Sequence, residues 1–232
     1  MAIVIENQAT PDNGGATLET GRSPSFGFTA TANRLLIAAL HVTRDNNSAR
    51  TPAVPSGWSD GGLSGWSFRG QTRVVYKIAT GSESSLTWAL TSGDGFLGSM
   101  IWEVSGIDTS TPYNQEKVGA ASSGTTFTAT AAGANGINDA LVFLAFHVDG
   151  RRITALDSLT TGYGSTQYDN NGATSSWTQI ATAKICTADE TPSCTPTWSG
   201  SSPNGYVMTV FNGAGGGGGG TPMHYFRRRR AA

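Results

Sequence analysis

One apolar run occurs twice in this chain of 232 residues, and the repetition constrains the fold more than any other feature. The first copy is Asn33-Arg-Leu-Leu-Ile-Ala-Ala-Leu-His41-Val42, and the second is Asn138-Asp-Ala-Leu-Val-Phe-Leu-Ala-Phe-His147-Val148. Short apolar runs that carry β-branched or aromatic residues and end in a polar turn are typical of strands buried on both faces. The sequence therefore predicts two equivalent buried strands.

Shorter matches follow the same order along the chain. Phe-Thr-Ala-Thr occurs at 28–31 and 127–130, and Thr-Trp occurs at 87–88 and 197–198. The spacing between copies varies by loop-sized amounts, as expected for two copies of one strand order. We interpret residues 1–213 as an internal duplication with units at about 26–106 and 125–213, each of six or seven strands.

The expected fold is an all-β, antiparallel, two-sheet β-sandwich with almost no helix. No window has a sustained apolar period of 3.6 residues, and strands joined by short loops pair antiparallel. Charged residues are 13% of the chain, against roughly 25% in an average domain, and 31 residues are Gly. We expect each unit to supply strands to both sheets; the alternative is two abutting small sandwiches.

Charge and hydropathy limit the partners. The formal net charge is −1, so the body is not expected to bind nucleic acid or an anionic membrane through its overall charge. No apolar run approaches the roughly 20 residues of a membrane span. The first residues, Met-Ala-Ile-Val-Ile-Glu-Asn, lack the basic and apolar regions of a signal peptide, so we expect no leader.

The chain has two cysteines, Cys186 and Cys194, which flank an expected hairpin with Pro192 in its turn. Cysteines that face each other across a hairpin could form a disulfide. Two unpaired thiols are the alternative interpretation.

The C-terminal segment 214–232 differs in character from the rest. A glycine run reaches Gly220 and is typical of a flexible tether. The candidate partner-docking residues after it are Met223, His224, Tyr225, Phe226, Arg227, Arg228, Arg229 and Arg230. We expect the apolar side chains to fill a partner's pocket and the guanidinium groups to meet carboxylates. A solvated basic tail and a nucleic-acid-binding tail are the alternatives.

No constellation typical of catalysis, metal binding or cofactor binding is found, so we expect no enzyme, no metal and no cofactor. His41 and His147 repeat with the strands and are interpreted as structural histidines. Glu103 lacks a partner carboxylate for glycoside hydrolysis and is expected on an exposed strand face. Asp94 and Asp169 are interpreted as turn residues, because neither has the spacing of a calcium loop.

Four aromatic residues lie in two long polar excursions, at 43–72 and 149–176. They are Trp58, Trp66, Tyr163 and Tyr168. Exposed rings there could stack on a glycan or contact a protein, whereas rings folded over the edge of the sandwich would be structural. Trp88 and Trp198 are expected in the core because they are equivalent in the two units.

Four segments together resemble a known class of domain. They are Pro55-Ser-Gly-Trp58, Val75-Tyr-Lys-Ile-Ala-Thr-Gly-Ser-Glu83, Leu86-Thr-Trp, and Ile101-Trp-Glu-Val-Ser-Gly-Ile-Asp108-Thr-Ser-Thr-Pro112. The chain resembles jelly-roll-type β-sandwich domains of tailed-phage virion proteins and of some bacterial surface proteins over most of residues 28–213. The resemblance implies a jelly-roll-like fold, oligomers, no cofactor, and no catalytic residues to carry over.

The resulting hypothesis is a non-enzymatic structural protein of a phage particle, either a capsid decoration or a fibre-like surface component. Its tail at 214–232 would anchor it to other virion proteins, capsid or tail subunits, and it would form homo-oligomers. It would be assembled in the host cytoplasm, reside in the virion and possess a surface that could meet host glycans. The alternative hypothesis is a lectin-like carbohydrate-binding module that uses the loop aromatics.

Overall fold

The computed structural model describes residues 2–12, 17–44, 49–67, 69–136, 139–170 and 177–215. Within these ranges every regular element is a β-strand, and every strand pairing is antiparallel. The prediction of an all-β, antiparallel sandwich is confirmed. The docking tail lies outside the described residues.

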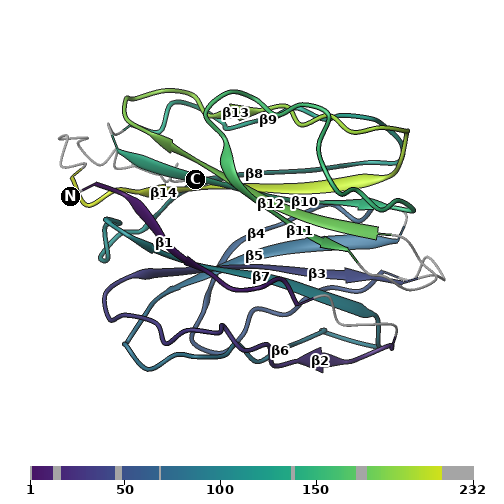
Figure 1. Cartoon of the computed structure of the whole chain (residues 1–232), viewed down its shortest axis with the longest axis horizontal. Coiled ribbons are helices and arrows are strands. Elements are labelled where there is room, and N and C mark those ends of the chain that lie inside the picture. The colour runs from purple at the N-terminus through teal and green to yellow at the C-terminus, as the bar shows by residue number, and fades with distance from the viewer. Residues whose placement is uncertain are drawn as a thin grey trace, which may run out of the picture.

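Two five-stranded sheets form the centre of the molecule (Figure 1). The first sheet has the order β1-β7-β3-β5-β4, and its strands are β1 (Val4–Gln8), β3 (Leu35–Thr43), β4 (Ser59–Leu63), β5 (Gly70–Ile78) and β7 (Phe96–Ser105). The second has the order β11-β12-β10-β14-β8, and its strands are β8 (Tyr113–Ala121), β10 (Ala140–Asp149), β11 (Gly164–Asn170), β12 (Trp177–Cys186) and β14 (Asn204–Asn212).

A two-stranded ribbon covers the outer face of each sheet, at the bottom and the top of Figure 1. The ribbons consist of β2 (Gly21–Arg22) with β6 (Trp88–Ala89), and of β9 (Ala129–Thr130) with β13 (Ser193–Cys194). The molecule therefore has four layers, namely ribbon, sheet, sheet and ribbon.

The two halves have one topology. Every strand of β1–β7 corresponds to the strand numbered seven higher, because β8-β14-β10-β12-β11 repeats the order β1-β7-β3-β5-β4. The expectation that each unit supplies strands to both sheets is wrong, since each half completes its own sheet. The units also begin earlier than 26 and 125, because β1 and β8 belong to them.

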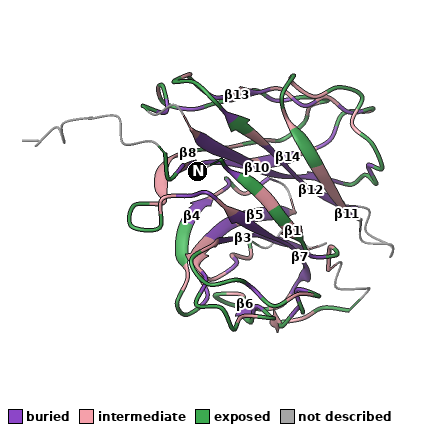
Figure 2. Ribbon diagram, turned by 60° about the vertical axis from the view of Figure 1, so that its left-hand side comes forward, coloured by how far each residue is buried: buried purple, intermediate pink, exposed green. Residues whose placement is uncertain are grey.

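The doubled apolar runs became β3 and β10, the central strands of their sheets. Alternate side chains of a strand point to opposite faces. From β3, Leu35 and Ile37 therefore face the other sheet in the central core, whereas Leu36 and Ala38 lie beneath the ribbon. Both faces are covered, so every residue of the strand is buried and most are apolar, and Figure 2 shows the resulting buried layer.

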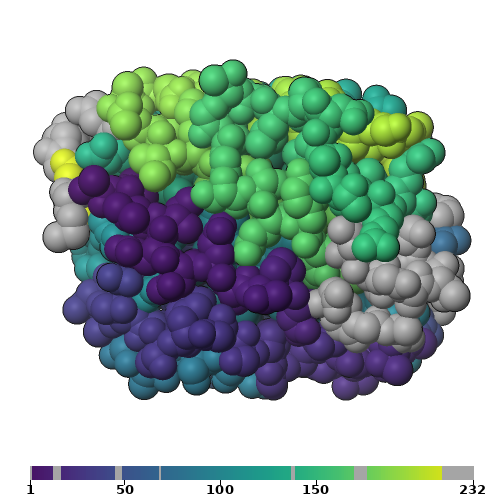
Figure 3. Space-filling model, viewed as in Figure 1, coloured from purple at the N-terminus to yellow at the C-terminus, as the bar shows by residue number. Residues whose placement is uncertain are grey.

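Three strands lie where the sequence predicted loops or a joint. β4 and β11 are edge strands inside the two polar excursions, and β8 is the edge strand between the expected units. β1 crosses toward the second half, visible in Figure 3 as the purple N-terminal residues against green ones. Gln167 Nε2 donates to Ala9 O at 2.9 Å, and Gln8 Nε2 donates to Ser165 O at 3.1 Å.

Both ends of the described chain meet at Gly106. Ala214 N donates to Gly106 O at 2.7 Å, and a Cβ on Gly106 would lie 2.2 Å from Ala2 O. Gly106 has a φ of 75°, which glycine adopts without strain. We call this end of the sandwich the proximal end. The opposite end, where β3 and β10 finish, is the distal end.

Candidate functional site

A group of buried polar side chains lies between the two sheets toward the distal end. We call it the buried polar cluster, and its members are His41, Ser67, Thr72, His147, Asp149, Asp169, Trp177 and Gln179. Every member is at most 2% exposed. Polar groups at such depth cost free energy unless they find partners, so their arrangement requires explanation.

Strand register brings the cluster together. In the first sheet, His41 pairs with Thr72 on one side and Gly98 on the other. In the second sheet, His147 pairs with Gln179 and with Gly205. Directly paired residues point to the same face of a sheet. Each half therefore presents a histidine flanked by one polar residue and one glycine, and the two rows face each other.

The glycines make room for side chains of the cluster. A Cβ on Gly98 would lie 2.5 Å from Asp169 Oδ2 and 2.7 Å from the Trp177 ring. A Cβ on Gly205 would lie 2.6 Å from His147 Cε1. Both positions lack the space that any other residue needs, so the glycines belong to the site as much as the polar residues do.

A chain of hydrogen bonds links the sheets. Thr72 Oγ1 lies 3.2 Å from His41 Nδ1 and 2.9 Å from His147 Nδ1, and the two rings stand 5.0 Å apart. Ser67 Oγ lies 2.6 Å from His147 Nε2 and donates to Asp149 Oδ2 at 3.2 Å. Neutral rings complete the chain if His41 Nδ1–H donates to Thr72, Thr72 donates to His147 Nδ1, and His147 Nε2–H donates to Ser67.

Other polar atoms of the cluster have no hydrogen-bond partner among the described residues. They are His41 Nε2, Asp149 Oδ1, both oxygens of Asp169, both side-chain polar atoms of Gln179, and Trp177 Nε1. A buried polar atom without a partner costs roughly 1–3 kcal/mol, and a charged one more. The cluster therefore favours whichever protonation states are neutral.

Burial shifts the pKa of each titratable member toward its neutral form. It lowers the pKa of His147 to about 3, and it lowers the pKa of His41, an effect that the neighbouring His147 reinforces. Burial raises the pKa of Asp149 to about 7, against opposing hydrogen bonds from Ser67 and the backbone of Arg69. It also raises the pKa of Asp169 to about 7, with a further increase from the charge of Asp12.

Ser67, His147 and Asp149 do not form a catalytic triad. In a triad the base accepts from serine through one ring nitrogen and the carboxylate holds the other. Here Asp149 lies on the Ser67 side, 3.8 Å from His147 Nε2, while Nδ1 meets Thr72. The serine is 2% exposed. The geometry thus supports a structural, proton-linked contact between the sheets and offers no open nucleophile. Across the described ranges, no three His, Cys, Asp or Glu side chains converge as metal ligands.

Glu103 is not on an exposed face, which corrects the sequence-based expectation. It is fully buried on β7 and accepts from Thr31 N at 2.6 Å and from Arg34 Nη1 at 3.2 Å. Asn7 also donates to it. These partners tie β1 and the segment before β3 to the sheet, which is a structural role.

The two aspartates considered as turn residues differ from each other. Asp94 pairs with Arg44, whose Nη1 lies 3.1 Å from its carboxylate, next to the start of β7. Asp169 is a buried strand residue of β11, so its interpretation as a turn residue is wrong. The polar sequence around it concealed an edge strand.

The four candidate aromatic residues do not form one platform. Trp58 packs against the core beneath the first ribbon, whereas Tyr163 and Tyr168 pack against the core beneath the second. These cores lie on opposite outer faces of the sandwich. Trp66 is half-buried in the loop between β4 and β5. Of the two expected core tryptophans, Trp88 and Trp198 are both buried beneath the ribbons.

Cys186 and Cys194 are free thiols in the structure, so the disulfide interpretation is not supported. Both are buried in the core beneath the second ribbon. Burial raises the pKa of each thiol to about 12, which leaves them protonated and unreactive.

We predict that neither thiol reacts with a maleimide in the native protein and that both react after unfolding in urea. Intact-mass spectrometry with and without prior reduction measures this. Labelling of the unfolded protein only after reduction would instead demonstrate a disulfide.

Comparisons with known proteins add no relative. No protein-family model, curated protein or solved structure matches the chain. In the part of the chain that the structure describes, no helix is long and apolar enough to cross a membrane.

Proposed function

We propose that this chain is a non-enzymatic structural protein of a phage particle, either a capsid decoration or a fibre-like surface component. The observation that carries the proposal is the shared position of the two chain ends. Ala2 and Ala214 both contact Gly106, so the segment after Ala214 leaves the body at its proximal end. A body held there would project its distal end away from the attachment point.

The point where the tail leaves the body suits this role because backbone hydrogen bonds hold it in place. Gly213 N donates to Asp139 O at 2.8 Å, and Asp108 N donates to Asn212 O at 2.8 Å. These bonds tie the last strand, β14, to the loops before β10 and after β7. A pull on the tail would therefore act on both halves of the sandwich.

Two further features support a structural role. The buried polar cluster is closed to solvent, so it offers no route for a substrate. Charged residues are few, and a surface of hydroxyls and short turns is compatible with many copies packed side by side on a particle. In this proposal the tail binds neighbouring capsid or tail subunits, and the protein acts as a homo-oligomer in the virion.

Removal of residues 216–232 should leave folding intact and abolish incorporation into particles. Every described contact of the body ends by Gly215, so the melting temperature should not change, while the proposed anchor is lost. Gradient sedimentation of a lysate, with the protein followed by mass spectrometry, measures incorporation. A full-length variant in which Arg227, Arg228, Arg229 and Arg230 become Gln separates the charge of the tail from its length.

Two outcomes would contradict the proposal in different ways. Truncated protein that still sediments with particles would show that the tail is not the anchor. Full-length protein recovered only as a free chain of 24.0 kDa, or as a small oligomer, would contradict the proposal that the protein is part of a particle.

A further inference from the structure

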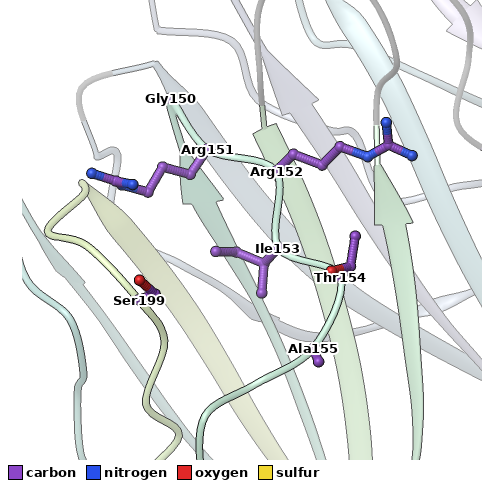
Figure 4. Close-up of a pocket in the computed structure, with 7 residues that line it drawn as sticks. All are labelled: Gly150, Arg151, Arg152, Ile153, Thr154, Ala155 and Ser199. Carbon is purple, nitrogen blue, oxygen red and sulfur yellow. The ribbon is translucent and has the colours of Figure 1, made fainter.

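The loop that follows β10 carries two adjacent arginines at the distal end. Arg151 and Arg152 border a shallow depression of about 430 Å³, together with Gly150, Ile153, Thr154, Ala155 and Ser199 (Figure 4). Both arginines are exposed. Among the described residues, no carboxylate forms an ion pair with either of them.

The backbone of this loop is held rigidly. Thr178, a fully buried residue of β12, donates through its Oγ1 to Arg151 O at 3.1 Å, and the same Oγ1 accepts from Ile153 N at 2.7 Å. Arg152 is therefore clamped between two bonds to one side chain, and the buried Ile153 anchors the loop in the core. A rigid loop loses little entropy when a ligand binds.

Arg151 is positioned by a glycine. A Cβ on Gly200 would lie 2.2 Å from Arg151 Cζ, so the guanidinium group lies against the bare backbone of the loop before β14. Its Nε also approaches Ser201 O at 3.5 Å. Gly200 has a φ of 79°, so this turn and the close approach both favour glycine.

The equivalent place in the first half is neutralised. Arg44 follows β3 as Arg151 follows β10, but Arg44 pairs with Asp94 at 3.1 Å. In the second half Ser201 takes the place of Asp94, because Gly205 pairs with His147 as Gly98 pairs with His41, and it offers Arg151 only a backbone oxygen. The duplication has thus left the arginines of one half without a carboxylate partner in the described structure.

We propose that this depression binds an anionic polysaccharide through its sulfate, phosphate or carboxylate groups. The two guanidinium groups diverge on either side of the loop in Figure 4, so they suit a ligand with repeated charges better than a single ion. Guanidinium groups match oxyanions well, and the hydroxyls of Thr154 and Ser199 are available to sugar hydroxyls. None of the described residues that line the depression is aromatic, so they give nucleic-acid bases no platform for stacking.

This inference extends the proposed function only by placing the site on the end that would face outward. The binding itself belongs to the body and needs no particle, so the two proposals fail independently. On a particle that carries many copies, weak individual contacts would add through multivalency.

The test measures binding of full-length protein to immobilised dextran sulfate and to polygalacturonate at low salt, with neutral dextran as a blank. The tail arginines would also bind polyanions, so every variant carries Gln at 227, 228, 229 and 230. Arg151→Gln/Arg152→Gln should weaken binding about tenfold or more, and its salt dependence should become less steep. The control Arg44→Gln/Lys117→Gln removes the same charge elsewhere and should stay within about twofold.

If Arg151→Gln/Arg152→Gln and Arg44→Gln/Lys117→Gln lose equal affinity for the polysaccharides, the proposed site is wrong, because net charge alone would then explain binding. Single-stranded DNA that binds as tightly as dextran sulfate and loses as much affinity in the Arg151/Arg152 variant would overturn the assignment to a polysaccharide. No binding of either polysaccharide by the protein that carries Gln at 227–230 and keeps Arg151 and Arg152 would overturn the proposal altogether.

Discussion

Asp169→Asn should stabilise the folded protein, and its advantage over the parent chain should grow as the pH rises from about 4 to about 7. Asp169 is 1% exposed, and neither of its oxygens has a hydrogen-bond partner among the described residues. Burial raises its pKa from 3.8 to about 7. The neutral amide of asparagine has nearly the same shape and no charge to desolvate.

The sign follows from proton linkage. A carboxyl with a raised pKa contributes stability that is fully present below pH 3.8 and is lost as the pH rises through about 7. Asparagine lacks this loss. The free energy of unfolding of the variant minus that of the parent should therefore increase by up to about 1.4 kcal/mol per pH unit. This difference should level off above pH 7, after a total increase of about 4 kcal/mol at most.

Urea unfolding at pH 4, 5.5, 7 and 8 measures this difference. Asp157→Asn is the matched control, because it removes the carboxylate of an exposed aspartate in the same half. A parallel shift of the Asp169→Asn curve at all four pH values would mean that folding does not perturb this carboxyl. The buried polar cluster would then need a charge that compensates Asp169.

The central strands were predictable because burial leaves a mark in the sequence. β3 and β10 are covered on both faces, so each is a continuous apolar run, and the duplication made each run confirm the other. The edge strands leave no such mark. Ser59-Asp-Gly-Gly-Leu63 is β4 only because it pairs with β5, and the pairing of a polar edge strand with its neighbour is not encoded in the composition of the edge strand itself.

The allocation of strands to sheets was not predictable for a related reason. The repeats showed that two units exist, but either arrangement of their strands would produce the same apolar pattern. The choice depends on which faces pack together. Here Leu35 of β3 and Leu141 of β10 share the central core, so each half buries one face of its own sheet against the other.

Of the buried polar cluster, the sequence indicated only the repeated histidines. It placed His41 and His147 at equivalent strand ends and assigned them a structural role. One further signal was present: Asp149 is two residues after His147 and so shares its face of the strand. Asp169 and Gln179 could not be found without the register that aligns β11 and β12 with β10.

His147→Gln should show the opposite pH dependence to Asp169→Asn. Burial lowers the pKa of His147 from 6.5 to about 3, so its contribution to stability is present above pH 6.5 and is lost as the pH falls toward 3. Glutamine does not titrate. Loss of the bonds to Ser67 and Thr72 should destabilise the variant at every pH, but this deficit relative to the parent should shrink as the pH falls from 6.5 to 4.

In the parent chain, this cluster should add little pH dependence to the free energy of unfolding between pH 4 and 6.5. In that window the folded state holds protons on Asp149 and Asp169, and the unfolded state holds them on His41 and His147 instead. The two states bind equal numbers of protons at these groups, so their contributions to the slope cancel.

The cancellation makes the double variant the decisive measurement. The quantity to compare is the free energy of unfolding of each variant minus that of the parent. For His147→Gln this difference should fall by about 1.4 kcal/mol per pH unit as the pH rises, and for Asp169→Asn it should rise by a similar amount. Combined, the two changes should restore a nearly flat curve, although at lower overall stability than Asp169→Asn alone. A double variant that keeps the slope of either single variant would show that the proton balance between the two sheets lies elsewhere.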